Sequence, residues 1–166
     1  MDVEIERKQD SSEETLKGRF LTFQVGSETY GIEIRYVIEI VGLQTFTVMP
    51  EMPECIKGIM NLRGKIIPIM DIRLRFNMPW HEYDDRTCII VIDMNEKSVG
   101  LVIDSVSDVL TINDDEIMKK PEMSTKEGCG YISRIGRKNK QVILLIDCGK
   151  LLSNDDLNIV SDYSGN

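Results

Sequence analysis

Residue types that build catalytic and metal sites are scarce in this sequence of 166 residues. Its one histidine is His81, so a Ser/His/Asp or Cys/His relay would have to rest on that residue, and no Gly-x-Ser-x-Gly motif accompanies it. There is no Walker loop and no Gly-x-Gly-x-x-Gly motif for phosphate binding. The sequence therefore predicts a protein that is not an enzyme and that carries no cofactor and no metal.

The cysteines do not form a recognisable set either. No Cys-x-x-Cys pair occurs among them, which favours small buried hydrophobes or free thiols over a metal site or disulfides. The four positions are Cys55, Cys88, Cys129 and Cys148.

Positive charge and long apolar runs are also in short supply. With 20 Lys and Arg against 28 Asp and Glu, the net charge is -8, which argues against a nucleic-acid partner because phosphates require a basic face. No apolar run approaches the roughly 18 residues needed to cross a bilayer. Residues 1–8 lack the basic-then-apolar order of a signal peptide. We expect a cytoplasmic protein that does not insert into the membrane.

One loop contains several groups that could bind a ligand. His81, Glu82, Asp84 and Asp85 could together hold a hard cation, but their spacing is not that of an EF-hand and no bidentate glutamate follows. A solvated acidic loop is the favoured interpretation. The rival hypothesis is a small enzyme or ligand-binding barrel that uses the Trp80–His81 loop.

What the sequence does contain is a series of short apolar segments joined by turns, with 42% hydrophobic residues in all. No long helical pattern separates these segments, which excludes a parallel βαβ architecture and favours one or two small barrels. Hairpins are expected from the paired runs 20–25 with 29–32, 88–93 with 99–104, and 131–135 with 141–147, and from the two apolar arms within 56–71 around the polar tip at 61–64.

Two local features refine this pattern. Gly64 can supply the positive φ that a tight hairpin turn needs, and Pro68 makes the second arm of that hairpin an edge or bulged strand. Residues 34–40 fit a short helix and an alternating strand equally well, so both remain open.

Polar, charged residues fill the N-terminus, and order is expected to begin abruptly at Arg19. The predicted organisation is a flexible tail at 1–17, one folded region at 18–160 and a C-terminal tail at 161–166.

The order of the segments in the chain is distinctive. Its most specific element is the Lys-Gly-x-x-Asn-Leu-Arg-Gly stretch at 57–64. This stretch and the surrounding segments strongly resemble the CheW family, the coupling proteins of bacterial chemotaxis, and the resemblance covers about residues 18 to 160. The other matching segments are 20–23, 30–34, 37–40, 66–71, 99–104, 106–110, 144–147 and 150–152.

This resemblance implies an all-β fold of two SH3-like five-stranded β-barrel subdomains around a shared hydrophobic core, with short helices. It also implies a non-catalytic adaptor that couples methyl-accepting chemotaxis receptors to the regulatory domain of the histidine kinase CheA. Receptor tips would bind near the groove between the barrels, kinase would meet the barrel edges, and the chain would be recruited to receptor arrays at the inner face of the membrane. The alternative is a CheW-like adaptor of a twitching or developmental system.

Position by position, the resemblance also implies a set of receptor-binding residues. Glu39 is an acid in an otherwise apolar segment, and Arg63 lies at a turn from which it could bind a carboxylate through two hydrogen bonds. Cys88 stands where the family usually has an aliphatic residue, which makes its role less secure. The full set is Val37, Glu39, Gly58, Arg63, Cys88, Gly100 and Val109.

Overall fold

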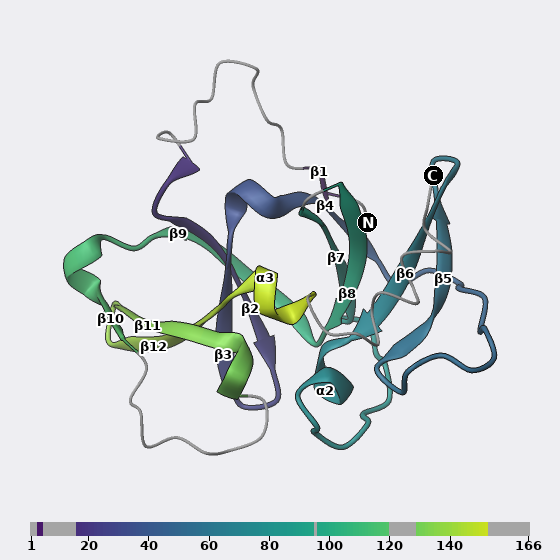
Figure 1. Cartoon of the computed structure of the whole chain (residues 1–166). Coiled ribbons are helices and arrows are strands. Elements are labelled where there is room, and N and C mark those ends of the chain that lie inside the picture. Colours follow the sequence, from purple (N-terminus) through teal and green to yellow (C-terminus); the bar gives the residue numbers. More distant parts are fainter. Residues whose placement is uncertain (1–2, 5–15, 95, 120–128, 153–166) are drawn as a thin grey trace.

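The computed structural model describes residues 3–4, 16–94, 96–119 and 129–152, and their strands form two six-stranded sheets that lie side by side (Figure 1). In each sheet five strands have six or seven residues and the sixth is shorter, so the all-β double-barrel prediction is confirmed. The first sheet has the order β1 (Val3–Glu4), β4 (Val37–Gly42), β7 (Cys88–Met94), β8 (Lys97–Ile103), β6 (Lys65–Asp71), β5 (Ile56–Leu62). The second has the order β10 (Ile117–Lys119), β11 (Ile132–Lys138), β12 (Gln141–Ile146), β3 (Glu28–Glu33), β2 (Arg19–Val25), β9 (Ser105–Thr111).

The four predicted hairpins are all present, as β2–β3, β5–β6, β7–β8 and β11–β12. The turn between β5 and β6 has Arg63 at φ 53° and Gly64 at φ 86°, the pair of positive values that a two-residue hairpin of type I′ requires. Pro68 pairs with Ile59 of β5, while pairing of β6 with β8 begins only at Ile69. The missing N–H of Pro68 therefore breaks no ladder, as the sequence predicted.

Residues 34–40 contain both of the alternatives that the sequence left open. Ile34–Tyr36 form a single 3-10 turn, η1, and β4 begins at Val37. The turn carries the chain from the second sheet to the first, and Asp104, between β8 and β9, carries it back.

The two sheets repeat one strand pattern. In each, the second strand of a hairpin runs parallel to a strand of another hairpin, as β6 does with β8 and β12 with β3. Each of these strands leads into a four-residue helix, α2 (Ile72–Arg75) after β6 and α3 (Cys148–Leu151) after β12. The carboxylates of Asp71 and Asp147 accept hydrogen bonds from the backbone N–H groups of Leu74 and Lys150, which caps both helices.

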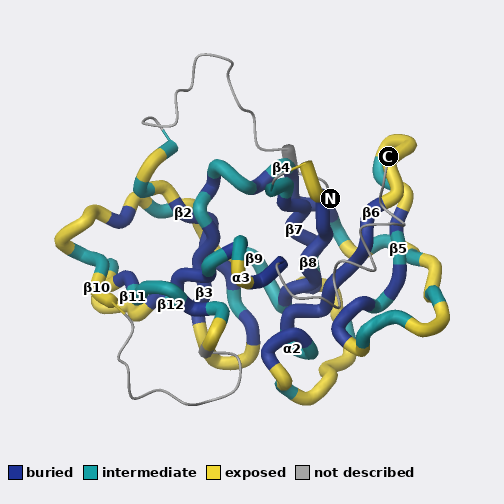
Figure 2. The backbone as a smooth tube through the Cα atoms, in the orientation of Figure 1, coloured by how far each residue is buried: buried dark blue, intermediate teal, exposed yellow. Residues whose placement is uncertain are grey.

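Three apolar clusters form the core. The largest lies between the two sheets, and both contribute to it, for example with Phe23 and Ile92, so the predicted shared core is confirmed. A second cluster fills the inside of the first sheet, with Val41 and Ile69 among its members. A third, around Phe20, fills the second sheet. In Figure 2 the buried backbone runs through the middle of the molecule and the exposed backbone lies in the outer turns.

A buried arginine links the two halves through their helices. Arg75 of α2 is 7% exposed and donates a hydrogen bond of 2.7 Å to the backbone oxygen of Leu151 in α3. Its guanidinium also lies 4.8 Å from the ring centroid of Tyr131, a cation–π geometry. Polar and apolar contacts thus both fix how the barrels sit against each other.

The cysteines match their predicted role as far as they are described. Cys55 and Cys148 are buried and Cys88 is partly buried. Burial raises the pKa of the Cys148 thiol to about 12. The side chain of Cys129, the predicted tail at 161–166 and most of the tail at 1–17 lie outside the described residues. Within the described ranges, no helix has both the length and the apolar composition to span a bilayer.

Candidate functional site

An ion pair between β4 and the β5–β6 turn is the most distinctive polar feature of the first sheet. The Nη1 and Nη2 atoms of Arg63 donate to Oε1 and Oε2 of Glu39, each at 2.7 Å. The Glu39 side chain is 1% exposed and that of Arg63 is 58% exposed. A carboxylate is thus buried in the barrel wall and reaches the surface only through its guanidinium partner.

Local sequence explains why these two groups meet. A bulge between Val37 and Glu39 shifts the register of β4 against β7, and it places Glu39 opposite Val91. At the turn, the side-chain oxygen of Asn61 accepts a hydrogen bond of 2.8 Å from the N–H of Gly64. The left-handed backbone at Arg63 then directs the side chain back over the sheet to Glu39.

The geometry changes the interpretation of Arg63. From the sequence, Arg63 was expected to bind a carboxylate of a partner, but in the chain by itself it binds Glu39 with both terminal guanidinium nitrogens. Because a buried carboxylate without a partner costs several kcal/mol, the arginine also stabilises the fold. The surface offered to a partner here is the outer side of a guanidinium that is already held in place.

Three of the other predicted site residues serve the packing. Val37 is fully buried in the cluster between the sheets. At Gly58, an added Cβ would lie 2.9 Å from the backbone carbonyl carbon of Thr47 and closer still to its oxygen. At Gly100, a Cβ would meet the side chains of Ile69 and Ile89, both at 2.8 Å. These positions support the barrel, and none of the three offers a side chain to a partner.

The remaining two predicted residues keep part of their surface. Cys88 opens β7, partly buried, opposite Gly42, and burial raises the pKa of its thiol. Val109 is 37% exposed on β9, at an edge of the second sheet. Six members of the predicted set thus belong to the first sheet or its turn, and Val109 belongs to the second.

Sequence reasoning missed a second polar cluster, at the crossover between the sheets. The carboxylate of Asp104 accepts hydrogen bonds from Nε of Arg73 at 3.0 Å, from Nη2 of Arg73 at 2.6 Å, and from the N–H of Gly26 at 2.8 Å. Arg73 belongs to α2 and Gly26 to the β2–β3 turn, so Asp104 joins the two barrels. No local sequence signal marks these contacts, because the partners lie far apart in the chain.

We expect Asp104→Asn to lower the free energy of unfolding by about 1.5 kcal/mol at neutral pH, the lower range for hydrogen bonds to charged groups because the site is partly exposed. Partial burial raises the pKa of Asp104, but the hydrogen bonds from Arg73 and Gly26 outweigh it and hold the pKa below its ordinary value. A lowered folded-state pKa stabilises the protein above the unfolded-state pKa, and this stabilisation is lost as the pH falls through the folded-state value. In urea unfolding, the difference in free energy of unfolding between wild type and Asp104→Asn should therefore shrink below about pH 4. A difference that does not change with pH would contradict the stabilising role of the Asp104 carboxylate.

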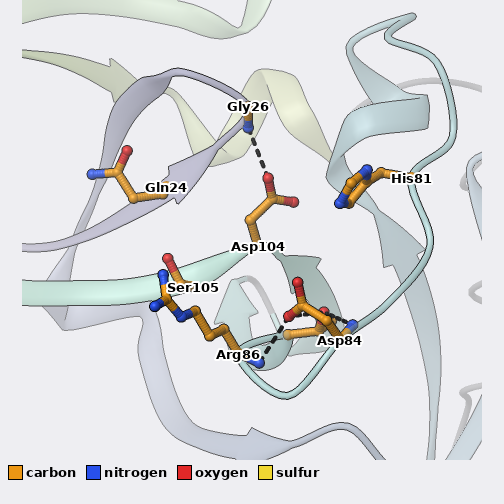
Figure 3. A pocket seen from close by; sticks show the side chains of 8 residues that line it. Gln24, Gly26, His81, Asp84, Arg86, Asp104 and Ser105 are labelled. Atoms are coloured by element: carbon orange, nitrogen blue, oxygen red, sulfur yellow. Dashed lines mark hydrogen bonds between the residues drawn. The ribbon is translucent and has the colours of Figure 1, made fainter.

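A cavity of about 260 Å³ lies beside this cluster, between the 77–87 loop, the β2–β3 turn and the start of β9 (Figure 3). His81 and Asp84 line it on the loop side and Asp104 on the crossover side. The cation set imagined from the sequence does not assemble, since no group of three or more His, Cys, Asp or Glu side chains in the described ranges could hold a metal ion.

Comparison with known proteins identifies the fold and the family together. The family model described as CheW-like domain matches residues 19–156. The chemotaxis protein CheW of Klebsiella aerogenes is 38% identical over 151 residues, 91% of each chain. CheW of Treponema pallidum is 31% identical over 143 residues, 84% of each chain.

A solved structure agrees with the sequence comparison. The crystal structure of the scaffolding protein TtCheW from Thermoanaerobacter tengcongensis superposes with a TM-score of 0.77 at 30% identity, and the match covers 84% of this chain and 94% of that one. The matched 84% of this chain is more than the strands of either sheet make up, so the match includes both barrels. The chain thus belongs to the CheW-like family.

Proposed function

We propose that this protein is a non-catalytic scaffold of bacterial chemotaxis that couples methyl-accepting receptors to the histidine kinase CheA. The observation that carries the proposal is the family match over residues 19–156, together with the likeness of both barrels to a protein solved as a scaffold. The named relatives are chemotaxis proteins, which favours this function over an adaptor of a twitching or developmental system.

The architecture suits a coupler. Two barrels joined by a shared core, by Arg75 and by Asp104 form one rigid body that can hold two partners at a fixed distance and angle. In the proposed arrangement, receptor tips bind near the groove between the barrels, and the regulatory domain of CheA meets the barrel edges. The protein works in the cytoplasm, at receptor arrays on the inner face of the membrane.

The predicted receptor-binding residues then divide by how they act. Arg63, Cys88 and Val109 retain surface that a receptor can touch. Glu39 acts by holding Arg63, while the buried or crowded positions Val37, Gly58 and Gly100 act by keeping the barrel in shape.

Val109→Glu is expected to reduce co-sedimentation of the protein with receptor-bearing membranes by about tenfold, because it places a charge in a contact that desolvates it. The measurement uses membranes with receptor but without kinase. Val142→Glu is the matched control, because Val142 is also an exposed strand valine of the second sheet, 52% exposed, and is outside the proposed receptor set. Equal loss in both variants, or none in Val109→Glu, would remove Val109 from the receptor surface.

The scaffold function itself is tested with the wild-type chain. Adding it to receptor membranes and purified CheA should recruit the kinase to the membrane fraction, and leaving it out should leave the kinase in solution. Absence of recruitment with folded protein would overturn the proposal.

A further inference from the structure

The loop at residues 77–87, between α2 and β7, presents the only tryptophan of the chain to solvent. Trp80 is 53% exposed, which is unusual for the side chain with the largest apolar area. The loop lies at the opposite end of β6 from Arg63, since the turn that contains Arg63 precedes this strand and α2 directly follows it (Figure 1). It is therefore separate from the Glu39–Arg63 pair.

The indole is held in place rather than loosely tethered. Its ring packs edge-on against Tyr83, with the centroids 6.0 Å apart. The Tyr83 hydroxyl donates a hydrogen bond of 2.6 Å to the buried carboxylate of Asp71, which also caps α2. Burial and this hydrogen bond both raise the pKa of Tyr83, so the phenol stays a donor at any physiological pH.

Backbone contacts fix both ends of the same loop. The N–H of Met78 donates to the backbone oxygen of Arg73 at 2.8 Å. At the other end, the carboxylate of Asp84 accepts a hydrogen bond of 2.8 Å from the N–H of Arg86, and the N–H of Asp84 donates one of 2.9 Å to the hydroxyl of Thr87. A loop ordered in this way loses little entropy when a partner binds, which makes Trp80 a preorganised anchor.

The charges around the indole select the partner. Glu82, Asp84 and Asp85 are all exposed within five residues of Trp80. In Figure 3 the side chain of Arg86 extends toward Ser105 and away from the carboxylate of Asp84, which accepts a hydrogen bond from the backbone N–H of this arginine rather than from its side chain. An indole face and a group of carboxylates both attract a cation, the first through its quadrupole and the second through charge.

The same cavity lies on the inner side of the loop and has a mostly polar lining, in which Arg86 stands beside His81, Asp84 and Asp104. Its volume, about 260 Å³, accommodates one long side chain with its water. A chain segment lying over the indole can therefore place a neighbouring side chain beside Asp84.

We propose that the 77–87 loop is a docking site for an arginine- or lysine-bearing segment of a second protein, with Trp80 as its anchor. The exposed indole supplies apolar and cation–π contact, the three carboxylates supply charge complementarity, and the cavity receives a second basic side chain. This site goes beyond the proposed coupling of receptor and kinase, and does not depend on it.

The test uses the fluorescence of Trp80, which reports on this site alone because the chain has no other tryptophan. The probe is a short synthetic peptide rich in arginine and leucine, added to the full-length protein. We expect a saturable change in emission, and no such change with the counterpart peptide that has glutamate in place of arginine.

Variants separate specific docking from general attraction of a basic peptide to a chain of net charge -8. Trp80→Ala keeps that charge and is expected to weaken peptide affinity about tenfold by calorimetry, with Trp80→Phe intermediate. Val48→Ala, which removes another exposed apolar side chain, 74% exposed, should bind as wild type does. Circular dichroism checks that each variant is folded.

Unchanged affinity in Trp80→Ala, or equal binding of the glutamate peptide, would overturn the proposal. Free arginine competing as well as the peptide would also overturn it, because the site would then bind a small cation rather than a protein segment. Retained recruitment of CheA to receptor membranes in Trp80→Ala would show that the loop is independent of coupling; the outcome of the peptide test does not affect the coupling proposal.

Discussion

Replacing Gly58 by valine is expected to lower the free energy of unfolding by about 3 kcal/mol, the upper range for overpacking a closely packed site. Gly58 follows a bulge in β5, and the segment that contains Phe46 and Thr47 lies directly against it. Two backbone hydrogen bonds of 2.8 Å between Thr47 and Ile59 hold that segment in place. A side chain at position 58 meets backbone, which cannot rotate away as a flexible side chain can.

Urea unfolding followed by circular dichroism measures this effect. The control is Gly130→Ala, since an added Cβ at Gly130 finds nothing within 4 Å, and its stability should change by less than about 0.5 kcal/mol. If Gly58→Val is as stable as wild type yet fails to bind receptor membranes, Gly58 is a direct contact and not a packing position. If Gly58→Val loses both stability and binding to receptor membranes, the loss of binding follows from the damaged barrel, and Gly58 need not contact the receptor.

The hairpins could be predicted from the sequence because their signals are local. Alternating apolar residues and a two-residue turn at Arg63–Gly64 decide the register of β5 and β6 within a few residues. Short helices were expected from the family resemblance, but the positions of α2 and α3 were not predicted. A helix of four residues is too short to show a periodicity. Asp71 and Asp147, whose carboxylates cap these helices, look in the sequence like polar residues at the end of a strand.

The repeated strand pattern of the two sheets has a trace in the sequence. Gly31, Val37 and Glu39 have the same spacing as Gly100, Val106 and Asp108. The glycine and the valine are identical in the two sets, and the third residue is an acid in both. Both glycines lie in the strand that pairs in parallel with the helix-bearing strand, and both are packed against isoleucine side chains. This internal similarity would have predicted two copies of one barrel.

The candidate site was predicted only in part. Glu39 and Arg63 were both named, but their pairing depends on a β-bulge and on the curvature of the first sheet, which bring together residues on β4 and on a distant turn. The Asp104 cluster was missed for the same reason. Polar residues can be recognised as unusual from the sequence, but their partners are determined by long-range folding.

Arg63→Ala is expected to lower the free energy of unfolding by about 2 to 3 kcal/mol and to reduce receptor co-sedimentation more than tenfold. The loss of stability arises at Glu39, which is 1% exposed and would keep a buried charge without its guanidinium. The estimate stays below the full range for buried pairs because Arg63 itself is 58% exposed and water can partly replace it. Lys65→Ala is the control, because Lys65 lies on the same hairpin but donates to the neutral hydroxyl of Ser98.

The double variant Glu39→Leu with Arg63→Leu separates stability from binding. Replacing both partners by apolar residues removes the buried charge, so most of the stability should return, whereas receptor binding should stay low if the guanidinium itself is the contact. Denaturant unfolding and membrane co-sedimentation of wild type, the two single leucine variants and the double variant complete the cycle. Recovery of binding together with stability would mean that the pair only shapes the barrel, and the receptor surface would then have to be sought at Cys88 and Val109.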